Sequence, residues 1–96
     1  MTIKKIIEDY NKRAKFIYNN EDILETAHTF GLMCSPTEFI GIENIISDII
    51  FEFYYLEDKD IENIRELLNK YSVIEKDYTI TVDNEFYNKI GGYVVE

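Results

Sequence analysis

Few residues in this chain have the chemistry of a catalytic nucleophile, and their spacing does not favour one. His28 and Cys34 are the only histidine and the only cysteine, and they stand six residues apart. A catalytic Cys–His pair needs a specific geometry and a third group that orients the imidazole. The neighbouring residues match no such arrangement. We therefore expect Cys34 to be a small buried apolar residue and His28 a surface or cap residue, and we predict no catalytic residue.

The patterns that bind metals and phosphates are incomplete. One histidine and one cysteine cannot build a tetrahedral zinc site without carboxylate help. Asp58, Asp60 and Glu62 alternate like the start of a calcium loop, but Asn63 stands where that loop requires glycine, and the glutamate at position twelve is missing. Gly91-Gly92 lacks the following helix and lysine of a phosphate loop. We predict no metal and no cofactor, and we interpret the three acids as residues at a helix start.

The charge of the chain is large and unevenly distributed. The net charge is −9. Residues 1–20 contain five basic and two acidic residues, which gives +3, whereas residues 21–96 contain five basic and seventeen acidic residues, which gives −12. Such a field repels nucleic-acid phosphates and attracts basic partners. The alternative is that the acidic charge only keeps the protein soluble.

One stretch has the outline of a helix-turn-helix. Ala27, Gly31 and Leu32 have the spacing of a first helix and its turn, and the helix that follows would be the recognition helix. That helix offers Glu38, Glu43 and Asp48 but no lysine or arginine. Because DNA-reading helices need phosphate contacts, we predict no direct binding of nucleic acid.

The most informative feature is a strip of acids mixed with aromatic residues. We expect the acids on the exposed side of a long central helix, on the joint after it and at the start of the next helix. At least one of Phe51, Tyr54 and Tyr55 should reach the surface there. Exposed aromatics supply contact area in protein interfaces, and flanking acids steer a basic partner; the alternative is a solvated face with the aromatics under loops. The predicted partner-binding residues are Asp48, Phe51, Glu52, Tyr55, Glu57, Asp58, Asp60, Glu62 and Glu66.

The helix that carries this strip is predicted over Ser35–Leu56. Ser35, Pro36 and Glu38 are typical of a helix start. One buried face is predicted by apolar residues at alternating spacings of three and four: Phe39, Ile42, Ile46, Ile49, Phe53 and Leu56. We expect this helix, residues 36–56, to be the centre of the fold.

Three further helices should surround it. Thr2 can cap a helix that runs to about Tyr18 and carries the basic cluster on its outer face. A second helix should begin with Asn20 as its cap and end at Gly31. The fourth should be capped by Asp58 or Asp60 and stop near Ser72.

The last twenty residues change to the spacing of a β-strand. Residues 78–82 alternate apolar with β-branched polar residues, and Asp83-Asn84 can form a two-residue hairpin turn. The return arm would be residues 85–90, which are equally compatible with a helical turn. Gly91-Gly92 predicts a hinge or turn and Tyr93–Val95 a possible last strand.

Together these patterns predict a mainly helical α+β fold: a four-helix domain around the central apolar helix, about residues 36–56, with a C-terminal β-hairpin. The 96 residues are expected to form a single domain, 1–96. No apolar run is long enough to span a bilayer, no signal peptide is evident, and a single cysteine is typical of a reducing compartment. We therefore expect a soluble, cytoplasmic protein.

In size, charge and its Ile/Asn/Lys/Tyr-rich composition, the chain resembles small accessory proteins of phages and mobile elements, including anti-defence proteins such as anti-CRISPRs, and toxin-immunity proteins. That resemblance implies a non-enzymatic inhibitor that binds a basic partner such as a nuclease or another nucleic-acid-binding protein. Two alternatives stay open. One is a homo-oligomeric structural or regulatory module, in which the +3 first helix pairs with the acidic remainder. The other is a small-ligand sensor or minor enzyme that uses the eight tyrosines.

Overall fold

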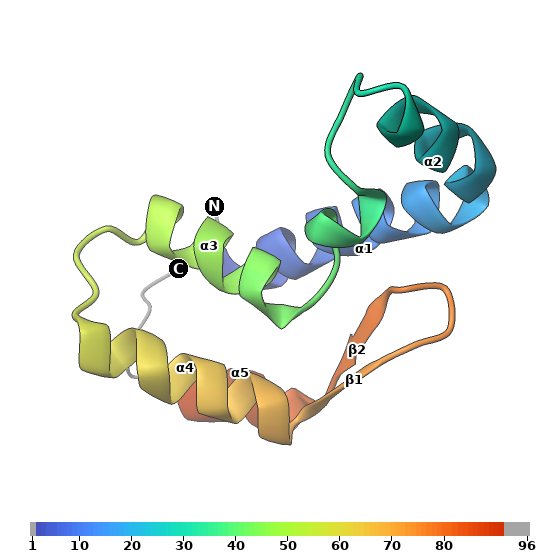
Figure 1. Ribbon diagram of the computed structural model, residues 1–96. Coiled ribbons are helices and arrows are strands. Elements are labelled where there is room, and N and C mark those ends of the chain that lie inside the picture. Colours follow the sequence, from blue (N-terminus) through green and yellow to red (C-terminus); the bar gives the residue numbers. More distant parts are fainter. Residues whose placement is uncertain (1, 92–96) are drawn as a thin grey trace.

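The computed structural model describes residues 2–91, and within them the fold is α+β and mainly helical (Figure 1). The chain runs through α1 (Ile3–Asn19), α2 (Glu21–Thr29), a 3-10 turn η1 (Pro36–Phe39), α3 (Ile42–Glu52) and α4 (Asp58–Lys70). Strands β1 (Ser72–Ile74) and β2 (Ile80–Val82) follow as an antiparallel hairpin, and α5 (Asn84–Ile90) comes last.

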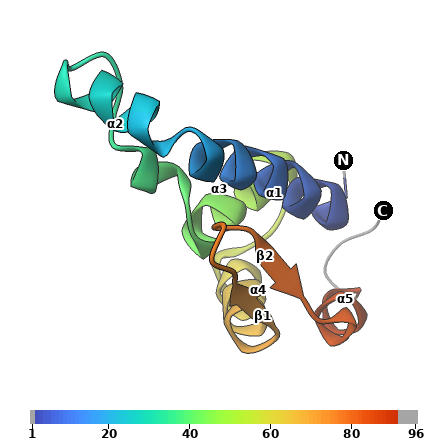
Figure 2. The ribbon, with the colours of Figure 1, turned by 90° about the vertical axis from the view of Figure 1, so that its right-hand side faces the viewer.

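Helix α3 packs against both α1 and α4, and α5 lies beside α4 (Figures 1 and 2). Helix α2 extends from the far end of α1, well away from α4 and α5, which makes the molecule elongated at 45 × 24 × 20 Å. Helix α3, which lies within the predicted helix 36–56, is therefore central to the fold, as predicted.

The core forms where α1, α3, α4, β2 and α5 meet. Helix α1 buries an unbroken stripe that includes Tyr10 and Ala14, and α3 buries Ile45, Ile46 and Ile49. The outer face of α1 lies opposite that stripe and carries the lysines. This confirms the prediction that the basic cluster lies on the outer face of the first helix. Helix α2, in contrast, contributes no buried residue.

The prediction of one unbroken helix over 36–56 is wrong in its bounds. The first turn, η1, is separated from α3 by extended Ile40 and by Gly41, whose φ of +113° belongs to glycine. The helix ends at Glu52, and Phe53 turns away from it while remaining buried. The predicted apolar stripe is nevertheless confirmed from Ile46 to Phe53, because α3 is continuous there and the Phe53 amide still donates to the Ile49 carbonyl at 2.8 Å.

The predicted helix caps are confirmed at some helix ends and are wrong at others. The Thr2 hydroxyl accepts the Lys5 amide at 3.0 Å, as predicted. Gly31, with φ +74°, closes α2, and the amides of Gly31 and Leu32 donate back to carbonyls of the last turn. The Asn20 side chain is no cap, because its amide donates instead to the Phe16 carbonyl at 2.8 Å.

At α4 the cap is one residue earlier than predicted. Glu57 is the N-cap, and its backbone amide donates to the Asp60 carboxylate at 3.0 Å. Asp60 therefore stabilises the helix start through this reciprocal contact, whereas Asp58 lies in the first turn.

The hairpin exists, but its predicted pairing is wrong. Strand β2 pairs with the preceding segment β1, with Val73 opposite Thr81, and does not pair with residues 85–90. Those residues form α5, because the Asp83 carboxylate accepts the Glu85 amide at 2.9 Å as a helix cap. Phe86 and Ile90, four residues apart, then face the core. Gly92 and the predicted strand Tyr93–Val95 lie outside the described residues.

Two polar side chains of α1 attach the hairpin to the helices. The Asn11 amide donates to the Ile80 carbonyl at 3.0 Å and accepts the Ile80 amide at 2.7 Å, as a neighbouring strand would. The buried Tyr10 hydroxyl donates to the Tyr78 carbonyl at 3.0 Å and accepts the Gly41 amide at 2.9 Å. Tyr10 therefore joins the hairpin to the start of α3.

Candidate partner-binding surface

His28 and Cys34 both lie at the end of the projecting α2 segment. The His28 imidazole makes a 3.0 Å hydrogen bond with the Met33 carbonyl, so its Nδ1 is the donor. Cys34 is exposed, which corrects the expectation that it is buried. The reason is that the turn after Gly31 carries it outside the core.

The described part of the chain offers little else for cofactor chemistry. Residues 2–91 contain no group of three or more His, Cys, Asp or Glu side chains arranged to hold a metal ion. Within the same residues, no helix combines the length and the apolar character that crossing a membrane requires.

The tyrosines do not converge on one pocket. Tyr10 is in the core, Tyr18 and Tyr78 meet at the α1–α2 joint, and Tyr54 and Tyr55 follow α3. Tyr93 lies outside the described residues. This distribution gives no support to a tyrosine-lined ligand site.

The end of α3 presents three aromatic side chains to solvent. Phe51 is 82% exposed, Tyr54 is 87% exposed, and Tyr55 is also exposed. The expectation that at least one of them reaches the surface is therefore confirmed. Tyr54, the most exposed, was absent from the predicted site residues. The signal that could have included it is its place directly after a helix end, where no second layer of chain covers it.

Two of these aromatics are held in place by ring contacts. The buried Phe53 ring meets the Tyr55 ring at 6.2 Å between centroids and an interplanar angle of 85°. Tyr55 in turn meets Tyr54 at 6.2 Å and 78°. Both are edge-to-face contacts, which are favourable between aromatic rings. The core thus orients Tyr55, and Tyr55 orients Tyr54.

Several acids of the predicted site are engaged inside the molecule. Glu62 receives the Arg65 guanidinium at 2.8 Å, and Glu43 receives the same guanidinium in a two-point contact at 2.8 and 3.0 Å. Hydrogen bonds from Arg65 to Glu43 and then Glu62 raise the pKa of the guanidinium further above its ordinary value. This triad bridges α3 and α4. The sequence spacing gave no indication of Glu43 pairing, because its partner lies 22 residues away.

Three more predicted acids have local roles. Asp48 lies 3.9 Å from Arg13 of α1, and Glu57 lies 3.7 Å from Lys59. Asp60 is committed to the start of α4. The predicted strip is therefore divided between intramolecular contacts and free acids.

The free acids of the predicted strip are Glu52, Asp58 and Glu66. Each is exposed, and the described residues provide none of them with an ion-pair partner. Glu52 ends α3 and Asp58 begins α4, so both lie next in sequence to the aromatic segment. Glu66 lies about 12 Å further along α4, given the rise per residue of an α-helix. We call Phe51, Glu52, Tyr54, Tyr55 and Asp58 the aromatic–acidic surface.

A shallow hollow of about 240 Å³ lies beside this surface, between α1 and α3. Ile6, Arg13 and Asp48 line it together with Phe51 and Glu52 of the aromatic–acidic surface. The Arg13 guanidinium also lies over the Tyr10 ring at 5.6 Å. The lining of the hollow therefore combines two apolar side chains with three acids, Asp9 included, and has Arg13 as its basic group.

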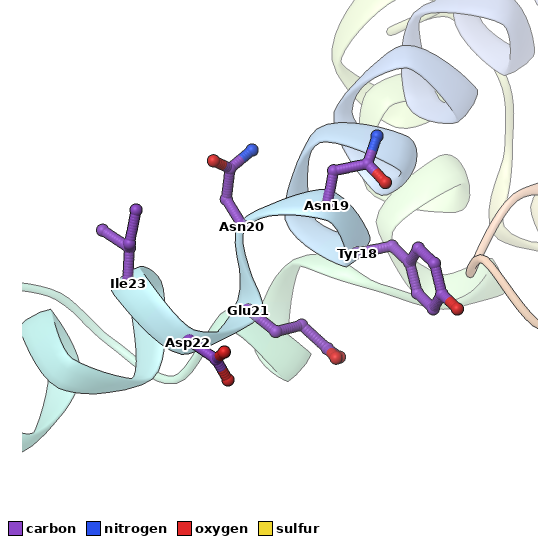
Figure 3. Close-up of a pocket in the computed structure, with 6 residues that line it drawn as sticks. All are labelled: Tyr18, Asn19, Asn20, Glu21, Asp22 and Ile23. Atoms are coloured by element: carbon purple, nitrogen blue, oxygen red, sulfur yellow. The ribbon is translucent and has the colours of Figure 1, made fainter.

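A second hollow lies at the joint between α1 and α2 (Figure 3). Tyr18 and Glu21 extend from the joint toward the same side. The Glu21 carboxylate accepts a hydrogen bond from the Tyr78 hydroxyl, and the Tyr18 and Tyr78 rings meet edge to face at 5.6 Å. These contacts fix the direction in which α2 projects, so we assign the joint a structural role.

Comparisons of the chain with protein-family models, with curated proteins and with solved structures find no match. The functional proposal therefore depends on the surface itself.

Proposed function

We propose that this protein is a small, acidic, non-enzymatic binding protein that inhibits or neutralises a basic partner protein. The observation that carries the proposal is that the segment from the end of α3 to the start of α4 exposes Phe51 and Tyr54 together with Glu52 and Asp58, two acids for which the described residues provide no ion-pair partner. Isolated exposed apolar residues are common, but clustered aromatics with unpaired charges are typical of interaction sites.

The two kinds of residue would contribute differently to binding. The aromatic rings supply contact area that loses water on docking. The Tyr55 ring already contacts the buried Phe53 ring, so ordering Tyr55 on docking costs less conformational entropy. The acids act at longer range, because the field of residues 21–96 steers a basic surface toward them.

The partner is best described by its chemistry. A surface rich in lysine and arginine that binds nucleic acid presents the complement of Glu52 and Asp58, and carboxylates docked there would exclude phosphate. A nuclease or another nucleic-acid-binding protein fits this description. We assign the activity to the cytoplasm, a reducing compartment in which the exposed Cys34 stays a thiol.

The experiment is an affinity capture from the source cell's heparin-binding fraction, which is enriched in basic, nucleic-acid-binding proteins. We expect the wild-type chain to retain a defined protein that Phe51→Ala/Tyr54→Ala and Glu52→Lys/Asp58→Lys do not retain. Charge reversal of Asp58, Asp60 and Glu62 is less suitable, because Asp60 supports the start of α4 and Glu62 pairs with Arg65.

Matched control variants make the same kinds of substitution at exposed positions outside the aromatic–acidic surface. Val73→Ala/Ile74→Ala truncates exposed apolar residues of the hairpin, and Glu38→Lys/Glu85→Lys makes the same change in charge away from the aromatic–acidic surface. Retention of the same proteins by all five chains would refute the proposed surface.

A further inference from the structure

Helix α2 is amphipathic, and part of its apolar face is left open, because Leu24 and Ala27 are half-buried whereas Ile23 and Phe30 are exposed. Ile23, Leu24, Ala27 and Phe30 share one side of the helix, but none of them is buried. Ile23 is 69% exposed and Phe30 is 74% exposed, and Leu32 directly after the helix is exposed as well. We call residues 21–32 the arm.

The arm is held in this open position by specific contacts. The Glu21 carboxylate accepts the Tyr78 hydroxyl, and the Gly31 and Leu32 amides close the end of α2 at 2.9 and 3.0 Å. Figure 2 shows the arm at one end of the molecule, away from α4 and α5. Because the arm is fixed rather than folded back, its apolar side chains are available to another molecule.

The charges on the arm indicate which molecule fits. The arm carries three acids, Glu21, Asp22 and Glu25, and no lysine or arginine, so its charge is −3. The outer face of α1 is mainly basic: it exposes four lysines and Glu8, with the exposed Phe16 among them, and Lys5 forms an ion pair with Asp9 at 3.2 Å. The lysines are Lys4, Lys5, Lys12 and Lys15. The rest of the chain is strongly acidic and would repel the arm.

We propose that two copies of this chain associate reciprocally, the arm of each copy lying across the outer face of α1 of the other. Ile23 and Phe30 of one copy then pack near Phe16 of its partner copy, with Asp22 at the edge of the contact, toward Lys12 and Lys15. Glu25 lies on the opposite side of the arm from Ile23 and contributes through the overall negative field of the arm. The contact is isologous, so each copy donates one arm and one basic face, and the assembly closes as a dimer. It uses none of the aromatic–acidic surface, so it stands or fails separately from the proposed function.

The test is sedimentation equilibrium of the full chain and of two charge-reversed variants. We expect the wild type to be a dimer that weakens with salt. Lys12→Glu/Lys15→Glu and Asp22→Lys/Glu25→Lys should each weaken association by about tenfold, because each variant changes the charges in both equivalent contacts of the reciprocal dimer and each contact loses the strength of an ordinary surface ion pair. An equimolar mixture of the two variants should recover a dimer. In the mixed dimer, the acidic arm of one variant faces the basic α1 of the other, and the lysine-bearing arm of the second faces the acidic α1 of the first.

Matched controls exclude a general effect of charge. Lys70→Glu/Lys89→Glu changes the net charge by the same amount as the α1 variant, on α4 and α5, and should leave the wild-type dimer unchanged. A wild-type monomer at high micromolar concentration would overturn the inference. So would a dimer that either charge-reversed variant retains at wild-type strength, or a mixture that fails to recover association.

Discussion

Tyr10 shows how one polar group can organise a small core. Its ring is fully buried, and its hydroxyl is both a donor, to the Tyr78 carbonyl, and an acceptor, from the Gly41 amide. Gly41 is also the residue whose positive φ separates η1 from α3. One phenol thus fixes the hairpin and the start of the central helix relative to α1.

Replacing Tyr10 by Phe should therefore destabilise the fold more than its small change in volume suggests. The variant leaves the Tyr78 carbonyl and the Gly41 amide without their partner, and we expect a loss of about 1–3 kcal/mol in the free energy of unfolding. Urea denaturation measures this loss. Tyr54→Phe removes a hydroxyl from an exposed ring and should stay within about 0.5 kcal/mol of the wild type. Equal stability of the two variants would contradict the role of Tyr10.

Tyr78 adopts a backbone conformation that is unusual for its residue type. Its φ of +69° lies in the left-handed region, which costs a residue with a Cβ about 1 kcal/mol. The side chain offsets this cost through the ring contact with Tyr18 and the hydrogen bond to Glu21. That hydrogen bond is the main reason why the pKa of Tyr78 is raised above its usual value, followed by desolvation and the charge of Glu21.

The raised pKa of Tyr78 predicts a loss of stability in alkali. The folded state favours the neutral phenol, so the contribution of Tyr78 is complete below the unfolded pKa of about 10 and is lost as pH rises through the higher folded value. Between about pH 8 and about pH 11, the stability difference between wild type and Tyr78→Phe should shrink. Desolvation also raises the pKa of Tyr87, but Tyr87 is present in both chains and cancels. A difference that stays constant over this range would contradict the prediction.

At the scale of elements, the hairpin depends on α1 as much as on its own strands. Strand β2 has β1 on one edge, and on the other edge Asn11 satisfies both backbone groups of Ile80. A two-stranded hairpin alone is marginally stable in water. The amide of Asn11 therefore acts in place of a third strand.

Asn11→Ala should release this edge of the hairpin. We expect a net loss of about 1–2 kcal/mol, because two hydrogen bonds outweigh the better helix propensity of alanine. Hydrogen exchange should speed up at the Ile80 amide, which Asn11 Oδ1 accepts, more than at the amides inside α1. Asn19→Ala, on an exposed position of the same helix, is the control. Unchanged protection at Ile80 would show that Asn11 does not hold the strand.

The elements that the sequence predicted well are those with a local cause. The apolar stripe from Ile46 to Phe53 and the Gly31 helix end follow from spacing and glycine geometry alone. The break at Gly41 and the pairing of β2 with β1 depend on distant partners, Tyr10 and Asn11. Gly41 itself is a local signal of a possible break, but the hydrogen bonds of Tyr10 and Asn11 join residues at least 31 positions apart, which no local pattern contains.

For the predicted partner-binding residues too, the sequence predicts some features and not others. Exposure of Phe51 and Tyr55 followed from the width of the apolar stripe, which exceeds what neighbouring helices can cover. The Glu43–Arg65 and Asp48–Arg13 pairs join residues that are far apart in sequence, so composition alone could not separate these paired acids from free ones.

At the scale of the whole molecule, the aromatic–acidic surface, the arm and the lysines of α1 occupy different parts of the surface. The aromatic–acidic surface lies around the end of α3 and the start of α4, whereas the arm projects from the far end of α1. The lysines of α1 lie on its outer face, opposite the buried stripe of that helix. This separation allows one face to bind a partner protein while the other pairs with a second copy. The lysines of α1 would then be shielded from solvent and the acids would dominate what a partner meets.

The most direct test is the affinity of the captured partner for the wild type and for Glu52→Lys/Asp58→Lys, measured by titration calorimetry at low and high salt. We predict that the charge-reversed chain binds about tenfold or more weakly at low salt, and that high salt narrows the gap between the two. Glu38→Lys/Glu85→Lys should bind like the wild type. Equal affinities for the wild type and Glu52→Lys/Asp58→Lys at both salt concentrations would contradict the account.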